Sequence, residues 1–494
     1  MTNPTGTPAS GTVVPAPASQ VAGTGSFALG PTSAIAATGD AVSVAEYLAD
    51  LLRVSTGFRL PVTEEGDVTL ALEAGHPPEG YALTITTDGI RIAADDAAGL
   101  FRGVQTLRQL LPLSGAGTDG WRVPATTIED HPRFAYRGAM LDVARHFFGV
   151  DDVKRYIDEL ALLKLNVLHL HLSDDQGWRL QIDEWPRLTE HGGSTQVGGG
   201  GGGFYTKDDY RAIVAHAASR FVTVVPEIDM PGHTNAALAS YPDLSCDGTA
   251  PALYEGIEVG FSSLCIGKER SYEFVEDVVT ELVELTPGPW IHIGGDESLA
   301  TPEADFLRFV ERASAIVAAQ GKIAIGWHEM GRSTNLPAGT IGEYWSFTTP
   351  RDDAAAVSQS FIDGGGKLIM APADVAYLDM KYDESSPLGL VWANGPTSVK
   401  ESYLWDPADI LPGVGDESIL GVEAPLWTET IATLDEVEFM AFPRLAAIAE
   451  IAWSPRVEKN FEEFAGRLAA FGERLDTLGI RCFRAPEVPW YPRV

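Results

Sequence analysis

The sequence predicts an α/β protein: a (β/α)8 barrel preceded by a small α/β domain of sheet and helices. Eight short apolar segments that resemble strands follow one another between residues 139 and 427, and amphipathic helical patterns or long connections separate them. A parallel strand pair needs a crossover long enough to hold a helix, so this alternation fits a closed parallel barrel. An open doubly wound sheet is the competing topology, but the sequence lacks a dinucleotide-binding fingerprint.

The N-terminal part contains a predicted tail and the small domain. Residues 1–25 are rich in Pro, Thr, Ala, Ser and Gly without periodicity, which predicts a flexible tail. Residues 26–133 then alternate between helical patterns at 41–52 and 97–111 and strand patterns at 67–72 and 81–94. Asp88-Gly89 inside the last segment is a hairpin turn signal. Strands beside helices predict a small layered domain.

The barrel is predicted to occupy residues 134–494. Its helices are expected at 151–163, 207–219, 270–285 and 302–319. The eight strand candidates lie at residues 139–145, 166–174, 223–230, 289–297, 322–330, 340–347, 367–374 and 420–427.

The charge balance argues against several partners. Asp and Glu number 69 and Lys and Arg 35, which gives a net charge of −34. Such a chain is repelled by polyphosphates and anionic lipid surfaces, so neither nucleic acid nor membrane binding is expected. No apolar run approaches the ~20 residues that a membrane span needs.

Compartment, redox state and oligomeric state stay open at this point. The first residues contain no basic residue and no apolar core typical of a signal peptide, so the chain is cytoplasmic as written, or secreted if a leader was removed. Cys246 and Cys265 flank a Gly- and Pro-containing segment and are expected either to form one bridge or to stay reduced. Cys482 is the odd cysteine.

Polar residues interrupt the apolar run at the end of most predicted strands. In a barrel the carboxyl ends of the strands carry the chemistry, so these residues are expected to meet at one face. Carboxylates accept hydrogen bonds from hydroxyls, and indole faces cover the C–H surface of a sugar ring, so the set indicates a neutral polyhydroxylated substrate. The interrupting residues are Arg145-His146, Asp174-Asp175, Glu227-Ile228-Asp229, Asp296-Glu297, Trp327-His328, Glu343-Tyr344-Trp345 and Trp427-Thr428-Glu429.

The same strand ends also suggest two other chemistries. His169 and His171 are two residues apart on one strand and point to the same side, so with nearby Asp they could ligate a divalent ion. No H-E-x-x-H motif or Cys ligand follows, and barrel interiors also hold such residues in hydrogen-bonded layers, so no metal is expected. A Ser-His-Asp triad is disfavoured because no G-x-S-x-G elbow follows a strand.

The sharpest motif is HIGGDE, residues 292–297. Two glycines let the backbone turn tightly at a strand end, and Asp296 and Glu297 then project into the barrel mouth. In an ordinary glycosidase two carboxyl groups flank the sugar from opposite sides. Two neighbouring residues cannot easily flank a sugar from opposite sides. One carboxyl group is therefore predicted to protonate the leaving oxygen, and the other to orient a different group.

At these residues the sequence resembles family-20 glycoside hydrolases, the β-N-acetylhexosaminidases, and particularly bacterial exo-acting enzymes of actinomycete type. The resemblance covers most of the chain. It rests on five long motifs in order: RGAMLDVARHFFGVDDVKRYID, LHLHLSDDQGWRLQID, VVPEIDMPGHTNAALASYPDL, HIGGDES and EAPLWTET. It implies a retaining, substrate-assisted mechanism in which the 2-acetamido oxygen of the substrate attacks the anomeric carbon.

The resemblance also implies a role for individual residues. Glu297 corresponds to the general acid and base, Asp296 to the acceptor of the acetamido N–H, and Tyr377 to the donor to the acetamido oxygen. Asp174 and His233 resemble a supporting pair beneath Glu297. The implied sugar-binding residues are Arg145, Asp379 and Glu429 for the hydroxyls, Trp327, Trp345 and Trp427 for the aromatic walls, and Trp392 on the leaving-group side.

The expected activity is therefore exo-hydrolysis of terminal N-acetylglucosamine or N-acetylgalactosamine from oligosaccharides or glycoconjugates, with no cofactor. A disaccharide-releasing enzyme similar to lacto-N-biosidases is one alternative, because loop lengths do not reveal the depth of the pocket. A carbohydrate-binding relative that lost catalysis is the other. This second alternative is disfavoured because the sequence retains Asp296, Glu297 and Tyr377.

Overall fold

The computed structural model describes residues 12–113 and 120–492. Two compact units divide the chain. The first comprises residues 1–133, 161–164 and 449–494, and the second comprises residues 134–160 and 165–448. The second unit therefore ends earlier than the predicted barrel domain, because the C-terminal helix α14 (Phe461–Thr477) belongs to the first unit.

The first unit contains a seven-stranded mixed sheet with the order β1-β7-β5-β6-β4-β2-β3. The helices α1 (Ala41–Thr56) and α2 (Ala97–Leu110) occur where the helical patterns predict them. The predicted hairpin is confirmed, since β5 and β6 pair antiparallel around the Asp88-Gly89 turn. The strands are β1 (Ser19–Leu29), β2 (Ile35–Ala36), β3 (Val62–Thr63), β4 (Val68–Leu72), β5 (Tyr81–Ile85), β6 (Ile90–Ala94) and β7 (Trp121–Asp130).

The predicted tail is wrong over the described residues 12–25. Val13 and Val14 are buried, and the Val14 N–H donates to Oε1 of Gln109 at 2.9 Å. From Ser19 the chain is the edge strand β1, paired antiparallel with β7. Most residues of β1 are exposed, so the strand shows no clear apolar alternation and composition alone missed it. Residues 1–11 lie outside the described part.

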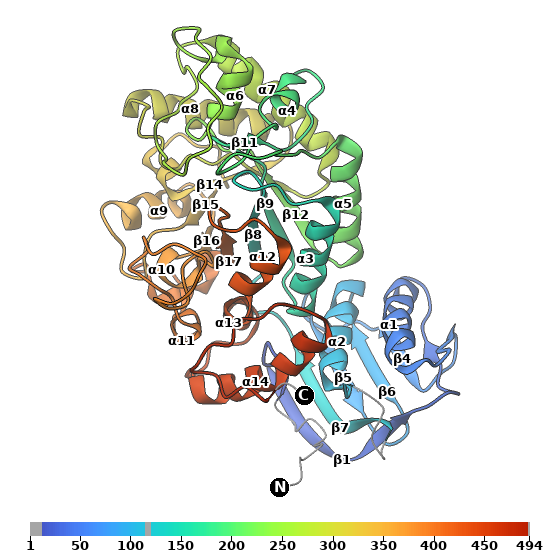
Figure 1. Cartoon of the computed structure of the whole chain (residues 1–494). Coiled ribbons are helices and arrows are strands. Elements are labelled where there is room, and N and C mark those ends of the chain that lie inside the picture. Colours follow the sequence, from blue (N-terminus) through green and yellow to red (C-terminus); the bar gives the residue numbers. More distant parts are fainter. Residues whose placement is uncertain (1–11, 114–119, 493–494) are drawn as a thin grey trace. The chain divides into compact units, whose positions relative to one another are not determined.

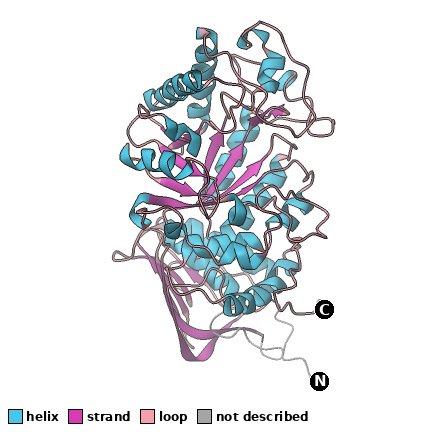
Figure 2. Cartoon of the chain, turned by 90° about the vertical axis from the view of Figure 1, so that its left-hand side faces the viewer, coloured by secondary structure: helices cyan, strands magenta, loops and turns pink. Residues whose placement is uncertain are grey.

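The second unit is the predicted barrel, closed by eight parallel strands (Figures 1 and 2). All eight strand candidates of the sequence supply one strand each. Most strand pairs share only three to six residue pairs, so each short strand leads directly into the loop at its carboxyl end. In barrel order the strands are β12 (Thr223–Glu227), β13 (Trp290–His292), β14 (Ile323–Trp327), β15 (Ile341–Tyr344), β16 (Leu368–Met370), β17 (Ile419–Leu426), β8 (Tyr136–Asp142) and β9 (Val167–His171).

Helices surround these strands, as Figure 2 shows for the central magenta arrows and the cyan helices around them. The four helices predicted between residues 151 and 319 are confirmed as α3, α5, α7 and α8. Short elements in the loops are α4 (Arg187–Glu190), α6 (Asn235–Ser240), α10 (Ala373–Ala376), α11 (Val399–Tyr403) and the strand pair β10 (Ser173–Asp174) and β11 (Gly177–Trp178). The longer helices are α3 (Val150–Leu162), α5 (Lys207–Ser219), α7 (Glu269–Leu285), α8 (Glu303–Ala319), α9 (Ala354–Asp363), α12 (Leu434–Ala441) and α13 (Arg444–Trp453).

Two further features of the chain are its cysteines and its lack of a membrane-spanning helix in the described residues. Cys246 and Cys265 form a disulfide that closes a loop with a sequence separation of 19 residues. Cys482 is buried. Within residues 12–113 and 120–492, no helix is both long and apolar enough to span a bilayer.

Candidate active site

The adjacent carboxyl groups of Asp296 and Glu297 follow directly after β13. Gly294 and Gly295 have positive φ angles of 71° and 100° and turn the chain there. A Cβ atom on Gly294 would lie 1.7 Å from Oδ1 of Asp229, so only glycine fits this turn. Glu297 itself has a φ of 42°. Such strain is typical of functional turns.

A chain of side chains leads from β9 to this pair. Asp174 follows β9, and its Oδ1 lies 3.2 Å from Nδ1 of His233. The Nε2 of His233 lies 3.6 Å from Oδ2 of Asp296 and 3.7 Å from Oε2 of Glu297. The predicted supporting pair is therefore in contact, and its outer nitrogen faces both carboxyl groups.

Burial shifts both carboxyl groups toward their protonated forms. The pKa of Glu297 is raised, first by burial and then by the charge of Asp296. Burial also raises the pKa of Asp296 to about 6, while His233 acts in the opposite direction. Raised carboxyl pKa values of this kind suit a group that donates a proton near neutral pH.

The supporting pair is charged. Burial alone would lower the pKa of His233, but Asp174, Asp296 and Asp229 together raise it well above its ordinary value. For Asp174, burial is outweighed by Arg145 and His233, which hold its pKa well below the usual range. An ionised Asp174 beside a protonated His233 therefore places one positive charge next to the two carboxyl groups.

Arg145 is fixed by acidic residues at the end of β8. Its guanidinium lies 2.8 Å from Oδ2 of Asp174 and 3.4 Å from Oδ2 of Asp142, and it covers the Trp427 ring with 4.7 Å to the centroid. Its Nε is buried and has no hydrogen-bond partner among the described residues. A buried, unmatched donor at this point can bind a substrate hydroxyl.

Asp379 and Glu429 add acceptors beside Arg145. Asp379 is buried, and neither of its carboxyl oxygens has a hydrogen-bond partner within the described part of the chain. Its pKa is raised well above the ordinary value, by burial and then by the charge of Glu429. Burial raises the pKa of Glu429 as well, against the effect of Arg145. Unsatisfied buried carboxyl groups are costly unless a ligand hydroxyl pairs with them.

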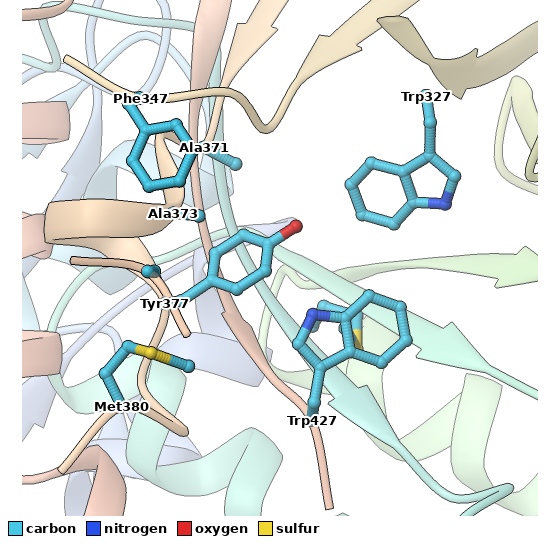
Figure 3. Packing of buried hydrophobic residues seen from close by; sticks show 9 residues of the cluster. Trp327, Phe347, Ala371, Ala373, Tyr377, Met380 and Trp427 are labelled. Carbon is cyan, nitrogen blue, oxygen red and sulfur yellow. The ribbon is translucent and has the colours of Figure 1, made fainter. Parts of the chain in front are cut away.

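An aromatic wall adjoins these polar groups. The indoles of Trp327 and Trp427 lie 5.9 Å apart between centroids, tilted by 41°. The hydroxyl of Tyr377 points toward the space beside these two indoles, as Figure 3 shows. The ring of Tyr377 lies 6.4 Å from that of Trp427. The predicted acetamido donor and two of the predicted walls are therefore neighbours.

The remaining two tryptophans extend this wall outward. Trp392 is 44% exposed and packs edge-on against Tyr377 at 5.7 Å and against Trp345 at 6.1 Å. Trp345 donates from Nε1 to Oε2 of Glu329 at 2.9 Å. An exposed indole at the outer end of the wall fits the predicted leaving-group side. All the site residues that the sequence predicts thus lie in the second unit, at or beyond the carboxyl ends of barrel strands.

Sequence reasoning left several supporting residues without a role. Asp142 accepts from the backbone N–H groups of Ala144 at 2.8 Å and Arg145 at 3.0 Å, so it shapes the turn that presents Arg145. The charge of Glu329 raises the pKa of Asp296, and burial raises the pKa of Glu329 itself to about 7. Glu227 hydrogen-bonds Trp327 and His171. The only sequence signal for Glu227 was its position at a strand end.

The barrel interior also contains groups that resemble metal ligands. Ligand atoms of His169, Glu227 and His292 lie within 4.8 Å of one another. However, Glu227 already accepts from His171 and Trp327, and His292 Nδ1 accepts from the Gly294 N–H at 3.1 Å. Glu227 and Nδ1 of His292 thus have protein partners, and the metal-free site stays a prediction from the sequence.

Comparison with known proteins places this arrangement in a family. Residues 134–304 and 298–456 match the model of glycosyl hydrolase family 20, catalytic domain, and residues 11–131 match that of glycosyl hydrolase family 20, domain 2. A β-N-acetylhexosaminidase of Cellulomonas fimi is 44% identical over 456 residues, covering 91% of this chain and 90% of the relative.

Solved structures that are similar to this chain indicate the same family. The GH20 β-N-acetylhexosaminidase from Streptomyces coelicolor A3(2) has 52% identity and a TM-score of 0.94, with 97% of this chain and 99% of that chain covered. The N-acetyl-β-hexosaminidase of Streptomyces plicatus in complex with Thio-NAglucal has 51% identity and a TM-score of 0.95, with 99% of each chain covered. The chain belongs to glycosyl hydrolase family 20.

Proposed function

We propose that the chain is an exo-acting β-N-acetylhexosaminidase that releases terminal, non-reducing N-acetylglucosamine or N-acetylgalactosamine with retention of configuration. The observation that carries this proposal is the adjacent pair of Asp296 and Glu297 beside the wall of Tyr377, Trp327 and Trp427. The side chain of Glu297 is 36% exposed, whereas that of Asp296 is only 10% exposed. This arrangement suits a reaction whose nucleophile comes from the substrate.

In the first step the acetamido oxygen of the substrate bonds to the anomeric carbon while the bond to the leaving oxygen breaks. Glu297 gives its proton to that oxygen, so the leaving group departs as an alcohol. Asp296 accepts the acetamido N–H and balances the positive charge of the oxazolinium. Tyr377 donates to the acetamido oxygen and holds it in line, which makes the attack intramolecular.

In the second step water attacks the anomeric carbon from the side that the leaving group vacated. Glu297, now ionised, takes the proton of this water as the bond to the acetamido oxygen breaks. Two inversions at the same carbon give retention overall, and no covalent bond to the protein forms. Because Glu297 recovers its proton, the site returns to its starting state.

Exo cleavage is supported by the polar groups on the far side of the site. Arg145 supplies a buried donor, and the buried Asp379 and half-buried Glu429 supply acceptors for ring hydroxyls, so the terminal sugar is expected to be held by all three. The relatives' names and the product complexes of the Streptomyces plicatus enzyme with GlcNAc support N-acetylhexosamine as the sugar. Chitin oligosaccharides are the proposed class of substrate.

The experiment is incubation of the protein with chitotetraose, followed by separation of the products over time. Successive release of monosaccharide from the non-reducing end supports exo-β-N-acetylhexosaminidase activity. Release of disaccharide would favour the lacto-N-biosidase-like alternative. Binding of N-acetylglucosamine by calorimetry without any hydrolysis would favour a relative that has lost catalysis.

A further inference from the structure

Glu227 is a buried carboxylate that the proposed mechanism does not use. It is the last residue of β12, and its backbone is in register with His171 on β9 and His292 on β13. It is 0% exposed. A fully buried carboxylate is costly unless it is paired, so its partners decide what it does.

The two carboxyl oxygens of Glu227 face opposite parts of the site. Oε2 lies 2.5 Å from Nδ1 of His171, whose Nε2 lies 2.8 Å from Oδ2 of Asp174. Oε1 accepts from Nε1 of Trp327 at 2.9 Å. The imidazoles of His292 and His169 also lie beside the carboxylate, with Nδ1 of His292 3.0 Å from Oε1 and Nε2 of His169 3.1 Å from Oε2. One carboxylate therefore contacts both the support of the acid–base residue and the wall beside the acetamido group.

The first contact continues to the reacting carboxyl groups. Asp174 accepts from His171 through Oδ2 and adjoins His233 through Oδ1, and His233 faces Asp296 and Glu297. Burial opposes a charge on His171, but Glu227 and Asp174 raise its pKa to about 9. Glu227 thus keeps a proton on Nδ1 of His171 and keeps Nε2–H directed at Asp174.

We propose that Glu227 is a positioning residue that aligns the general acid and the acetamido wall through its two oxygens. The inference rests on the proposed function. A glutamine at this position has a single amide oxygen and cannot serve both contacts. In one orientation its NH2 group meets the N–H of Trp327, and in the other it meets Nδ1 of His171, which must then lose its proton.

The test compares Glu227→Gln with Glu423→Gln as a matched control. Glu423 is also 0% exposed, accepts from Tyr136 and contacts Nδ1 of His169 at 2.7 Å, while Nε2 of His169 lies 3.1 Å from Oε2 of Glu227. Glu423→Gln therefore removes a buried charge from the same layer but keeps the contacts of Glu227 with His171 and Trp327. Folding is checked by circular dichroism and thermal melting. kcat and KM are measured on p-nitrophenyl and phenyl β-N-acetylglucosaminides, and the inhibition constant of N-acetylglucosamine is measured beside them.

A p-nitrophenolate leaves without much protonation, whereas phenol needs the acid, so the ratio of the two kcat/KM values reports on acid catalysis. For Glu227→Gln we expect a loss of about 10-fold to 100-fold in kcat/KM, the size seen for partners of metal-bound histidines. This loss should be accompanied by about a 10-fold change in the ratio of the two kcat/KM values or in the inhibition constant of N-acetylglucosamine. Glu423→Gln should keep both parental values.

His171→Gln is the second variant, because it removes the imidazole that joins Glu227 to Asp174 and keeps the contact of Glu227 with Trp327. It should change the leaving-group ratio and leave the inhibition constant at the parental value. Parental ratios and inhibition constants in both variants, or the same changes in Glu423→Gln, would overturn the inference. A parental protein without hydrolytic activity would instead overturn the proposed function.

Discussion

The Nε2 atom of His233 lies 3.7 Å from Oε2 of Glu297. This distance is longer than a hydrogen bond, so His233 acts on Glu297 through its charge. The positive charge of His233 lowers the pKa of Glu297, while burial and the charge of Asp296 raise it. The raising effects are larger, so the pKa of Glu297 lies above its ordinary value. Glu297 therefore stays protonated at a pH where an ordinary glutamate is ionised, which is what a general acid requires.

Replacing Glu297 by glutamine tests the acid role. The amide keeps the shape but has no transferable proton, so kcat/KM should fall by about 10²-fold to 10⁴-fold on phenyl β-N-acetylglucosaminide. The loss should be smaller for the p-nitrophenyl substrate, whose leaving group needs less protonation. Steady-state kinetics on both substrates measures this. Near-parental turnover of the phenyl substrate would show that another group is the acid.

Replacing Asp296 by asparagine tests the balance of charge in the intermediate. The positive charge develops only as the oxazolinium forms, so kcat should fall by about 10²-fold or more while KM changes little. The comparison requires kcat and KM together with a melting curve. Equal losses in substrate binding and turnover with an unchanged fold would contradict the role.

The pH profile of kcat/KM should be bell-shaped. Asp296 must be ionised, and its pKa is raised to about 6, so the rate should fall as the pH drops through that value. Glu297 must be protonated and its pKa is raised, so the rate should fall as the pH rises through its pKa.

In Asp296→Asn the acid limb of this profile should disappear. The alkaline limb should move to lower pH, because the Asp296 charge that raises the pKa of Glu297 is gone. Rate measurements across the pH range at low substrate concentration check both shifts. An unchanged acid limb in the variant would assign that limb to another group.

Tyr377→Phe tests the positioning of the acetamido oxygen. The ring packing against Trp392 and Trp427 is kept, and only the hydroxyl is lost. Loss of one such donor costs about 10²-fold to 10³-fold in kcat when the donor acts on a developing charge. Affinity for N-acetylglucosamine should change much less. Trp392→Phe is a useful comparison, since it should act mainly on larger leaving groups.

Much of the fold could be predicted because the barrel repeats one simple pattern. Most barrel strands are short apolar runs with a polar residue at the end of the strand or soon after it, and this pattern is visible in sequence. The edge strand β1 was missed because most of its residues are exposed, so its pairing with β7 leaves no alternation. The C-terminal helix α14 joins the first unit through contacts that sequence order does not reveal.

The residues of the candidate site could be predicted from the sequence, but the contacts between their side chains could not. The strand ends and the HIGGDE turn identified Asp296 and Glu297, and family resemblance added Tyr377 and Trp392 from loops. The two-sided contact of Glu227 depends on which strands are neighbours in the barrel. Residues 171, 227 and 327 are far apart in sequence, and only barrel closure brings them together.

The most direct test of the central claim compares p-nitrophenyl β-N-acetylglucosaminide with p-nitrophenyl β-glucoside, which differ at the 2-acetamido group. If that group supplies the nucleophile, the glucoside loses the intramolecular step, which is worth up to about 7–11 kcal/mol in model systems. The account predicts rapid hydrolysis of the first substrate, inhibition by a thiazoline analogue, and negligible hydrolysis of the glucoside. Comparable kcat values on both substrates would contradict substrate-assisted catalysis.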